Sequence, residues 1–189
     1  MKTGTKSVLF GVHQFLLHPF FVAIAWWIIY RDIPRPHEIA AIITHDLGYW
    51  GAENMDGPEG EAHPERMAAW WRRHFGAFGE RVAVEVLGHS RSHARQHGLP
   101  LSRLCWPDKL CTALYPRWLY LLLANLSGEI HEYMALCQGN GKYNDVVKAG
   151  KTQMQWLIET QAHMALIGLH GDSYPPRRKS AVAIAEQNT

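Results

Sequence analysis

Residues 9–30 read LFGVHQFLLHPFFVAIAWWIIY, a stretch that has no charged side chain but contains two histidines, His13 and His18. About 20 consecutive apolar residues suffice to span a bilayer, so the stretch has the length of a membrane helix. A helix that is apolar on all sides can equally be buried in a protein core. Basic residues flank the stretch at both ends and give no orientation signal. The choice therefore depends on whether the histidines have partners elsewhere in the chain.

The composition is that of an ordinary globular protein. The chain has 189 residues, of which 47% are hydrophobic and 19% are charged, enough to bury the core of one domain. The formal net charge of +2 is too small to indicate a nucleic-acid partner. The three cysteines, Cys105, Cys111 and Cys137, show neither CxxC nor zinc-finger spacing, which favours buried, reduced thiols. No small-residue cleavage site follows the apolar stretch, so we expect no signal peptide and a cytoplasmic location.

Strand-like alternation of apolar and polar residues is scarce, so the sequence predicts helices nearly throughout. The expected helices cover residues 8–30, 36–47, 64–75, 79–96, 101–113, 116–137 and 144–169, with a break allowed at Gly128. We therefore predict an all-α fold with one helical domain over residues 1–170. Residues 171–189, which include the basic cluster Arg177, Arg178 and Lys179, are expected to form a flexible tail.

Two pairs of residues have the spacing of metal ligands. His45 and Asp46 are adjacent at the end of the apolar run AAIITHDLGYWG, and consecutive helical residues point about 100° apart, so the pair can flank one ion. His89 and His93, in LGHSRSHARQHG, are spaced i, i+4 and are predicted to lie on one helical face, an arrangement well suited to a metal. Either pair alone is weak evidence.

Three further residues strengthen the metal hypothesis. His63 begins the helical segment HPERMAAWW. Asp108 lies in LCWPDKLCTAL between apolar neighbours, where burial without a partner would be costly. His18 shares an apolar helix face with Val22 and Ala25, and an unpaired imidazole would be poorly placed there. Each residue alone is more often an ordinary core or surface residue, but together they indicate a metal site.

In this order the residues resemble the HD-domain superfamily of metal-dependent phosphohydrolases, whose pattern is a helix-borne His, a His-Asp pair and a later Asp. The residues that match are His18, the pair His45 and Asp46 in HDLG, and Asp108 in PDKL. A Lys commonly follows the last Asp in the superfamily, as Lys109 does here. The resemblance covers roughly residues 10 to 125, and its short motifs gain their specificity from their order and spacing.

The resemblance implies a helical bundle with a buried site for one or two divalent ions. Two-metal members add two histidines before the final Asp, and by position His63 and His89 match them, with His93 as a competitor for the second. The first ion would be held by His18, His45, Asp46 and Asp108, and the second by Asp46, His63 and His89. Imidazoles and carboxylates suit Mn, Fe, Co, Ni, Zn or Mg. Two such ions activate a water and neutralise a phosphoryl group during in-line attack.

Residues around the proposed ligands are candidates for catalysis. Asp46 would act as the ligand that both ions share. Candidates for contacting the substrate phosphate are Lys109, His93, Arg91 and Arg95, and for the arginines surface solvation is an equal alternative. Glu53 and Asp56, in the glycine-rich loop after HDLG, are candidates for a general acid or base, or for a contact with the ligating imidazoles. The alternative for this loop is a solvated turn.

The substrate class stays open because the chain departs from the common pattern. Tyr49 stands where many members have Lys or His after HDxG, and the Arg and Glu-Ser-Val-Ala-like signature of the small deoxynucleotidases is missing. We expect a small phosphorylated substrate, a nucleotide or another metabolite, and no nucleic acid. The alternatives are a di-iron oxygenase, which uses the same ligand types to activate dioxygen, and a non-catalytic regulatory domain that a metal stabilises.

The metal hypothesis assigns residues 9–30 to a protein core. If His18 binds the same ion as the HD pair, the stretch runs through the centre of a helical bundle, and insertion into a membrane would separate His18 from its partners. We therefore expect no membrane association. His13 lies on a different helical face and is expected to be an ordinary histidine. The apolar segment RWLYLLLANL could provide a face for homo-oligomers.

Overall fold

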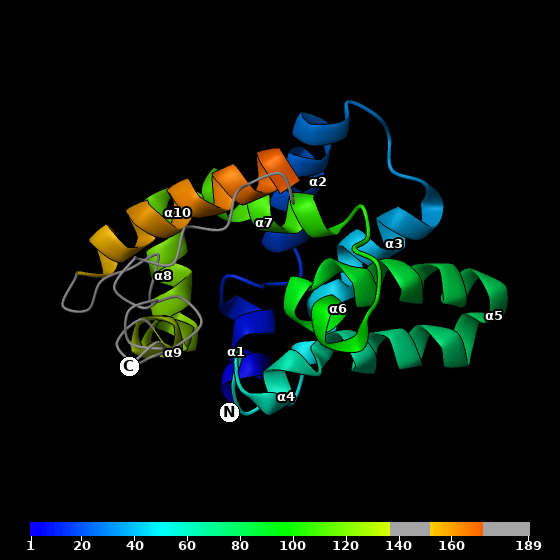
Figure 1. Cartoon of the computed structure of the whole chain (residues 1–189). Coiled ribbons are helices and arrows are strands. Elements are labelled where there is room, and N and C mark those ends of the chain that lie inside the picture. Colours follow the sequence, from blue (N-terminus) through cyan, green and yellow to red (C-terminus); the bar gives the residue numbers. More distant parts are fainter. Residues whose placement is uncertain (137–151, 172–189) are drawn as a thin grey trace, which may run out of the picture.

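The computed structural model describes residues 1–136 and 152–171, and within these ranges the chain is helical and contains no strand (Figure 1). The elements are α1 (Thr3–Phe10), α2 (Leu17–Tyr30), α3 (Pro36–Thr44), the 3-10 turn η1 (His45–Tyr49), α4 (Pro58–Glu61), α5 (His63–His89), α6 (Arg91–His97), α7 (Cys105–Leu114), α8 (Arg117–Ser127), α9 (Glu129–Leu136) and α10 (Gln153–His170). The all-α prediction is confirmed. Residues 172–189 of the expected tail and residues 144–151 of the last expected helix lie outside the described residues.

The apolar N-terminal stretch forms two helices rather than one, which corrects the prediction. α1 ends because Gly11 adopts an extended conformation, with φ −94° and ψ −163°. α2 begins where the side chain of Gln14 accepts hydrogen bonds from the backbone amides of Leu16 and Leu17, at 3.0 and 2.7 Å. These amides would otherwise lack a partner at the start of a helix. His18 therefore lies in the first turn of α2.

One face of α2 is buried and the other is exposed. Val22, Ala25 and Trp26 are buried in the core, whereas Phe20 and Trp27 are 58% and 51% exposed. The helix therefore borders solvent along one side and does not run through the centre of the bundle, in contrast to the prediction. Within the described residues, no helix is both long enough and apolar enough to cross a membrane.

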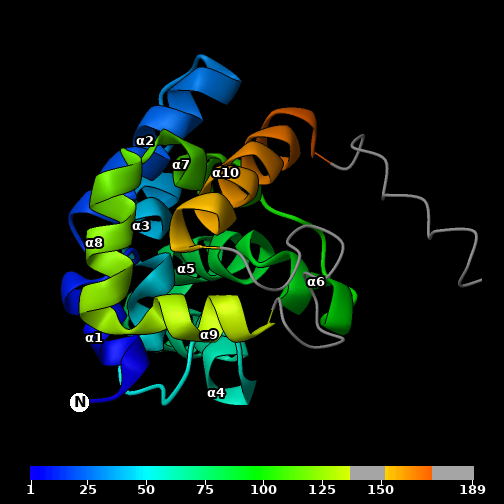
Figure 2. The same ribbon diagram turned by 90° about the vertical axis from the view of Figure 1, so that its left-hand side faces the viewer.

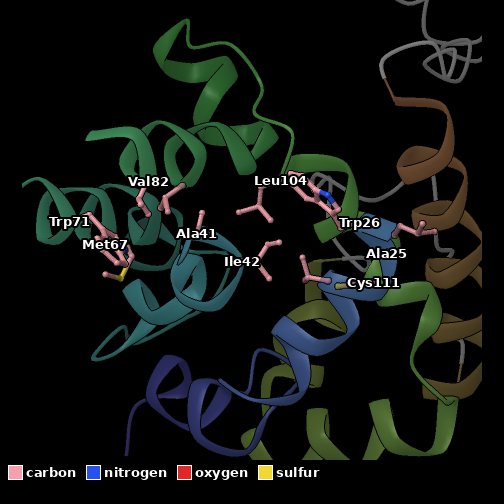
Figure 3. Packing of buried hydrophobic residues seen from close by; sticks show 12 residues of the cluster. Ala25, Trp26, Ala41, Ile42, Met67, Trp71, Val82, Leu104 and Cys111 are labelled. Atoms are coloured by element: carbon pink, nitrogen blue, oxygen red, sulfur yellow. The ribbon is translucent and has the colours of Figure 1, made fainter. Parts of the chain in front are cut away.

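The main core lies where α2, α3, α5 and α7 meet, together with Leu104 just before α7 (Figure 3). Its buried residues are Val22, Ala25, Trp26, Ala41, Ile42, Met67, Trp71, Val82, Val86, Leu104, Leu110 and Cys111. Burying one large aliphatic side chain stabilises a fold by about 1.5–3 kcal/mol, so this cluster fixes the relative positions of the helices. α7 packs against both α2 and α10 (Figure 2). A second apolar cluster joins α8, α9 and α10.

α5 folds back on itself at Gly76, where the backbone leaves the helical conformation with φ +49°. Figure 1 shows its two legs side by side. The legs approach closely at Gly79, where a Cβ atom would lie only 2.0 Å from the carbonyl oxygen of Trp71. The two helices predicted on either side of this region are therefore the legs of one hairpin. The hairpin brings its two ends, His63 and His89, to within 3.1 Å of each other.

Gly128 ends α8 and starts the corner towards α9. Its φ of +86° lies in the left-handed region, which glycine adopts without strain. Figure 2 shows α9 running across the end of α8. The break that the sequence allowed at Gly128 is confirmed. Directly after the corner, the side chain of Glu129 is fully buried.

Arg103 joins the loop before α7 to α2 and α3. Its guanidinium lies 2.7 Å from Asp32 Oδ2 and 3.1 Å from Glu38 Oε1, and it covers the ring of Trp26 at 4.6 Å from the centroid. Glu38 is only 2% exposed, so the substitution Arg103→Ala would leave a buried carboxylate without its charged partner. We expect the free energy of unfolding, measured by urea denaturation, to fall by about 3 kcal/mol.

Arg72→Ala is the matched control for this prediction. The ion pairs of Arg72 with Glu80 and of Arg103 with Asp32 have the same shortest N–O distance, 2.7 Å. The partner Glu80 is 54% exposed, and an exposed pair contributes at most about 1 kcal/mol. Equal losses of stability for the two variants would contradict the role assigned to Arg103.

Candidate metal centre

Four side chains from three elements converge at the start of α2. The Nε2 atom of His18 lies 3.1 Å from Nε2 of His45, 3.0 Å from Asp46 Oδ2 and 3.3 Å from Asp108 Oδ1. All four residues are buried, with exposed fractions between 1% and 8%. His18 belongs to α2, His45 and Asp46 belong to η1, and Asp108 belongs to α7. The packing of α7 on α2 therefore places the last Asp of the pattern beside its first His.

A second group of candidate ligand atoms also includes an oxygen of Asp46. The other carboxylate oxygen, Oδ1, lies 3.6 Å from His63 Nε2 and 3.8 Å from His89 Nε2, and these two nitrogens are 3.1 Å apart. Both histidines are buried, at the two ends of the α5 hairpin. The two oxygens of one carboxylate therefore face two different groups of donors, the arrangement of a carboxylate that bridges two ions.

The rings of three histidines are oriented by hydrogen bonds behind them. In each, Nδ1 donates to a backbone carbonyl three or four residues earlier. The pairs are His45 with Ala41 and Ile42, His63 with Gly60, and His89 with Val86. A carbonyl oxygen can only accept, so the proton is assigned to Nδ1 and the Nε2 lone pair points into the cluster.

The Nε2 lone pairs of these histidines need an electron-pair acceptor, such as a metal cation. The Nε2 atoms of His63 and His89 lie 3.1 Å apart with no proton between them. Asp46 Oδ2 is buried and has no hydrogen-bond partner among the described residues, although His18 is near. Two nitrogens bound at right angles to one ion, at about 2.1 Å, would be about 3 Å apart, which matches both histidine pairs. The buried His and Asp residues therefore fit, and could hold, a metal ion.

Burial and charge set the protonation states in the second group. Burial, together with the neighbouring His45, lowers the pKa of His89 to about 4. Burial and His89 lower the pKa of His63 well below its usual range. Burial acts to raise the pKa of Asp46, but His45 and the other histidines outweigh it and hold this pKa well below its usual range. Neutral imidazoles and an ionised carboxylate are the states that bind metals.

His18 shows the opposite shift. Burial acts to lower the pKa of its imidazole, but Cys111, Asp46 and Asp108 outweigh burial and raise this pKa well above its usual range. Its Nδ1 atom lies 3.6 Å from the Cys111 sulfur, a contact that the sequence did not indicate. Cys111 and the two buried carboxylates therefore favour a positive charge at His18, which either a proton or a metal cation supplies.

Gly48 and Tyr49 hold η1 directly against the start of α5. A Cβ atom on Gly48 would lie 2.0 Å from the carbonyl oxygen of His63, so the approach requires glycine. The ring of Tyr49 stacks on the imidazole of His63, with 3.8 Å between centroids and 20° between planes. Tyr49, which departs from the common HD pattern, thus covers one face of a candidate ligand.

His93 does not lie beside His89, which corrects the predicted i, i+4 pair. α5 ends at His89, and Ser90, with φ −82° and ψ 113°, separates it from α6. The ring of His93 lies instead against His97, with 4.4 Å between centroids, and near Glu65. Of the two competitors for the second group, His89 is the one that lies in the cluster.

The other catalytic candidates occupy different places. Lys109 Nζ lies 2.6 Å from Asp108 Oδ2, and Lys109 lines both cavities that open at the cluster. Asp56 also lines both cavities. Glu53 is exposed, forms an ion pair with Lys2 at 2.9 Å and is not among the described residues that line either cavity. The structure therefore places Lys109 and Asp56 at the cluster, and Glu53 outside it.

His13, which was expected to be an ordinary histidine, lies next to His18 and contacts Glu129, a residue that sequence reasoning left out of the site. The ring of His13 lines both cavities, 5.4 Å from the ring of His18, and its Nδ1 atom lies 3.1 Å from Glu129 Oε2. Glu129 accepts four further hydrogen bonds, at 2.7–2.9 Å, from Ser7 Oγ, the Val12 amide, Ser127 Oγ and the Tyr133 hydroxyl. The i, i+4 spacing of Glu129 and Tyr133 was a visible signal, but the pairing with His13 across 116 residues was not.

No protein-family model, curated protein or solved structure matches this chain. A function is therefore inferred from the geometry and chemistry of the cluster itself. The observations that bear on it are a shared buried carboxylate, two facing histidine pairs and two adjoining cavities.

The substitution Asp46→Asn tests whether the cluster binds metal, because it keeps the shape of the side chain and removes its charge. We expect a divalent ion at about 100 times its Kd to stabilise the wild type by about 2.7 kcal/mol. Thermal denaturation with and without the ion, alongside metal analysis of the purified protein, should show this stabilisation lost in Asp46→Asn. His74→Gln is the control, because His74 is an exposed histidine of α5 outside the cluster. An equal metal-induced shift in wild type and Asp46→Asn would contradict the site.

Proposed function

We propose that the protein is a metal-dependent phosphohydrolase that hydrolyses a phosphate ester of a small metabolite, as its resemblance to the HD-domain superfamily implies. The observation that carries the proposal is that the two carboxylate oxygens of Asp46 face two separate groups of histidines. A carboxylate shared in this way suits a pair of metal ions, and paired ions suit in-line displacement at phosphorus. The all-α fold and the burial of the donors are consistent with it.

The two groups of donors suggest two ions rather than one. The first would be held by His18, His45, Asp46 and Asp108, and the second by Asp46, His63 and His89. Four imidazoles and two carboxylates favour the borderline ions Mn, Fe, Co, Ni and Zn over Mg. When bound, such a pair supplies a nucleophile from water near neutral pH and neutralises the charge of a phosphoryl group.

Lys109 supplies a positive charge next to the reacting group. Its ammonium is held by Asp108 Oδ2 at 2.6 Å, while Asp108 Oδ1 faces the histidines. Lys109 can therefore donate to a phosphoryl oxygen without leaving its carboxylate partner. Burial acts to raise the pKa of Asp108, but Lys109 and the histidines outweigh it and hold this pKa well below its usual range.

Glu129 acts through His13 by fixing the orientation of the ring. Because a carboxylate that already accepts four other hydrogen bonds also accepts from His13, the proton of a neutral His13 is on Nδ1. Nε2 is then the nitrogen available to the cavities that the ring lines. There it can accept a hydrogen bond from a water or a substrate hydroxyl and orient it. Glu129 is thus a positioning residue.

Activity assays with a generic phosphate ester in the presence of Mn or Co test the proposal. We expect turnover that a chelator abolishes, and a kcat at least about a thousandfold lower for Asp46→Ala, because both ions lose a ligand. His74→Ala should keep the wild-type rate. Equal activity in wild type and Asp46→Ala would contradict the proposal. Consumption of dioxygen without release of phosphate would favour the oxygenase, and metal-dependent stability without any turnover would favour the regulatory domain.

The substitution Lys109→Met tests whether the Lys109 ammonium contacts the substrate phosphate without being a metal ligand. A hydrogen bond to a charged group is worth about 1.5–3 kcal/mol, so kcat/KM should fall about tenfold to hundredfold. The metal content should stay at the wild-type level, because Lys109 is not one of the candidate metal ligands. Lys2→Met, which removes an exposed lysine outside both cavities, is the matched control. An unchanged kcat/KM for Lys109→Met would contradict the role of the ammonium.

A further inference from the structure

Two cavities of different character meet at the metal cluster. Both are lined by His13, Asp108 and Lys109. The larger, about 420 Å³, also contains the candidate ligands Asp46, His63 and His89. The smaller, about 170 Å³, is lined by the candidate ligand His18 and extends from it towards α8, α9 and α10. A substrate whose reacting group lies at the shared boundary would place its remaining part in one of these two spaces.

The larger cavity is suited to the phosphoryl group. Besides the candidate ligands, its walls carry hydroxyl and cationic groups from the junction of α5 and α6, namely Ser90, Arg91, Ser92 and Arg95. Hydroxyl and guanidinium groups are donors that match phosphate oxygens. The phosphorus and its oxygens would therefore lie on this side of Asp108 and Lys109.

The smaller cavity is suited to a flat apolar group. Five tyrosine and tryptophan side chains line it, from Tyr49, Tyr115, Tyr120, Tyr133 and Trp156. The Tyr115 hydroxyl donates to the Val12 carbonyl at 3.0 Å, and the Tyr133 hydroxyl donates to Glu129 at 2.9 Å. Because these two hydroxyl protons are engaged by the protein, Tyr115 and Tyr133 offer ring surface rather than free donors to a ligand. Ring surfaces favour stacked or edge contacts with another ring.

The volume limits what this cavity accepts. An apolar protein cavity of about 150 Å³ is known to hold a benzene molecule, so a space of this order accepts one six-membered ring. The smaller cavity, at about 170 Å³, is of that size. A nucleoside carries a sugar in addition to its base, so the base alone would fill this space and the sugar would have to lie outside it.

We propose, on the basis of the phosphohydrolase function above, that the substrate is a phosphate monoester of a small alcohol or phenol that carries a single apolar ring. The ring occupies the smaller, aromatic cavity, and the phosphoryl group faces Asp46 and Lys109. A water oxygen forms the new bond to phosphorus, and the bond between phosphorus and the ester oxygen breaks. One water proton ends on that ester oxygen, so the products are the ring-bearing alcohol or phenol and inorganic phosphate.

Phosphonates test the proposal because their C–P bond is not hydrolysed, which separates binding from the leaving-group effect of a phenol. Calorimetry on the full, metal-loaded chain would compare inorganic phosphate, methylphosphonate, phenylphosphonate and a nucleoside phosphonate. We expect phenylphosphonate to bind at least tenfold tighter than methylphosphonate and than the nucleoside phosphonate. Phenylphosphonate and methylphosphonate binding with similar Kd values, or tighter binding of the nucleoside phosphonate, would overturn the assignment of the substrate. Absence of binding for all four would instead overturn the phosphohydrolase proposal together with it.

A variant that fills the aromatic cavity locates the ring. Thr160, on α10, lines this cavity, so Thr160→Phe places a phenyl group where the substrate ring is proposed to lie. The ratio of the Kd values of methylphosphonate and phenylphosphonate should fall from at least ten to about one. Ile158→Phe, at an exposed position of the same helix, is the matched control and should keep the wild-type ratio. A ratio in Thr160→Phe equal to that of the wild type would overturn the placement of the ring, and the wild-type comparison still decides the substrate class if Thr160→Phe does not fold.

Discussion

The buried carboxylate of Asp46 is the group on which the arrangement of this protein depends. Its two oxygens face different histidine pairs, and those histidines come from α2, η1 and the two ends of the α5 hairpin. Together with Asp108, it places two negative charges on residues that are at most 8% exposed. Such charges are tolerated in a protein interior only when they are paired or coordinate metal ions. The convergence of these elements therefore has a chemical reason as well as a packing reason.

The groups that would hold metal come from one part of the chain, whereas the aromatic cavity also uses a second part. The candidate ligands lie between His18 and Asp108. The cavity is lined both by residues of this part and by residues of α8, α9 and α10, and the buried Glu129 begins α9. His13 connects the two parts, because its ring lies beside His18 while its Nδ1 atom is held by Glu129. A candidate metal centre built from one part of the chain is in this way joined to a cavity that the other part completes.

The sequence by itself determined the all-α class, the interruption of the helix between residues 75 and 79 and the break at Gly128. It also singled out six residues that the structure brings together as two groups of donors around Asp46. The physical reason is that an imidazole or carboxylate among apolar neighbours is costly to bury without a partner. Residues such as His18 and Asp108 therefore indicate, from local context alone, that partners exist elsewhere in the chain.

Only the tertiary structure decided which residues those partners are and where each helix ends. The stop of α1 at Gly11 and of α5 at Ser90 removed one predicted long helix and one predicted histidine pair, because backbone conformation at a helix end depends on what the chain packs against next. The contact of His13 with Glu129 spans 116 residues, and no periodicity in a sequence encodes such a distance. Local polarity identifies a residue that needs a partner, whereas the partner itself is selected by the packing of distant helices.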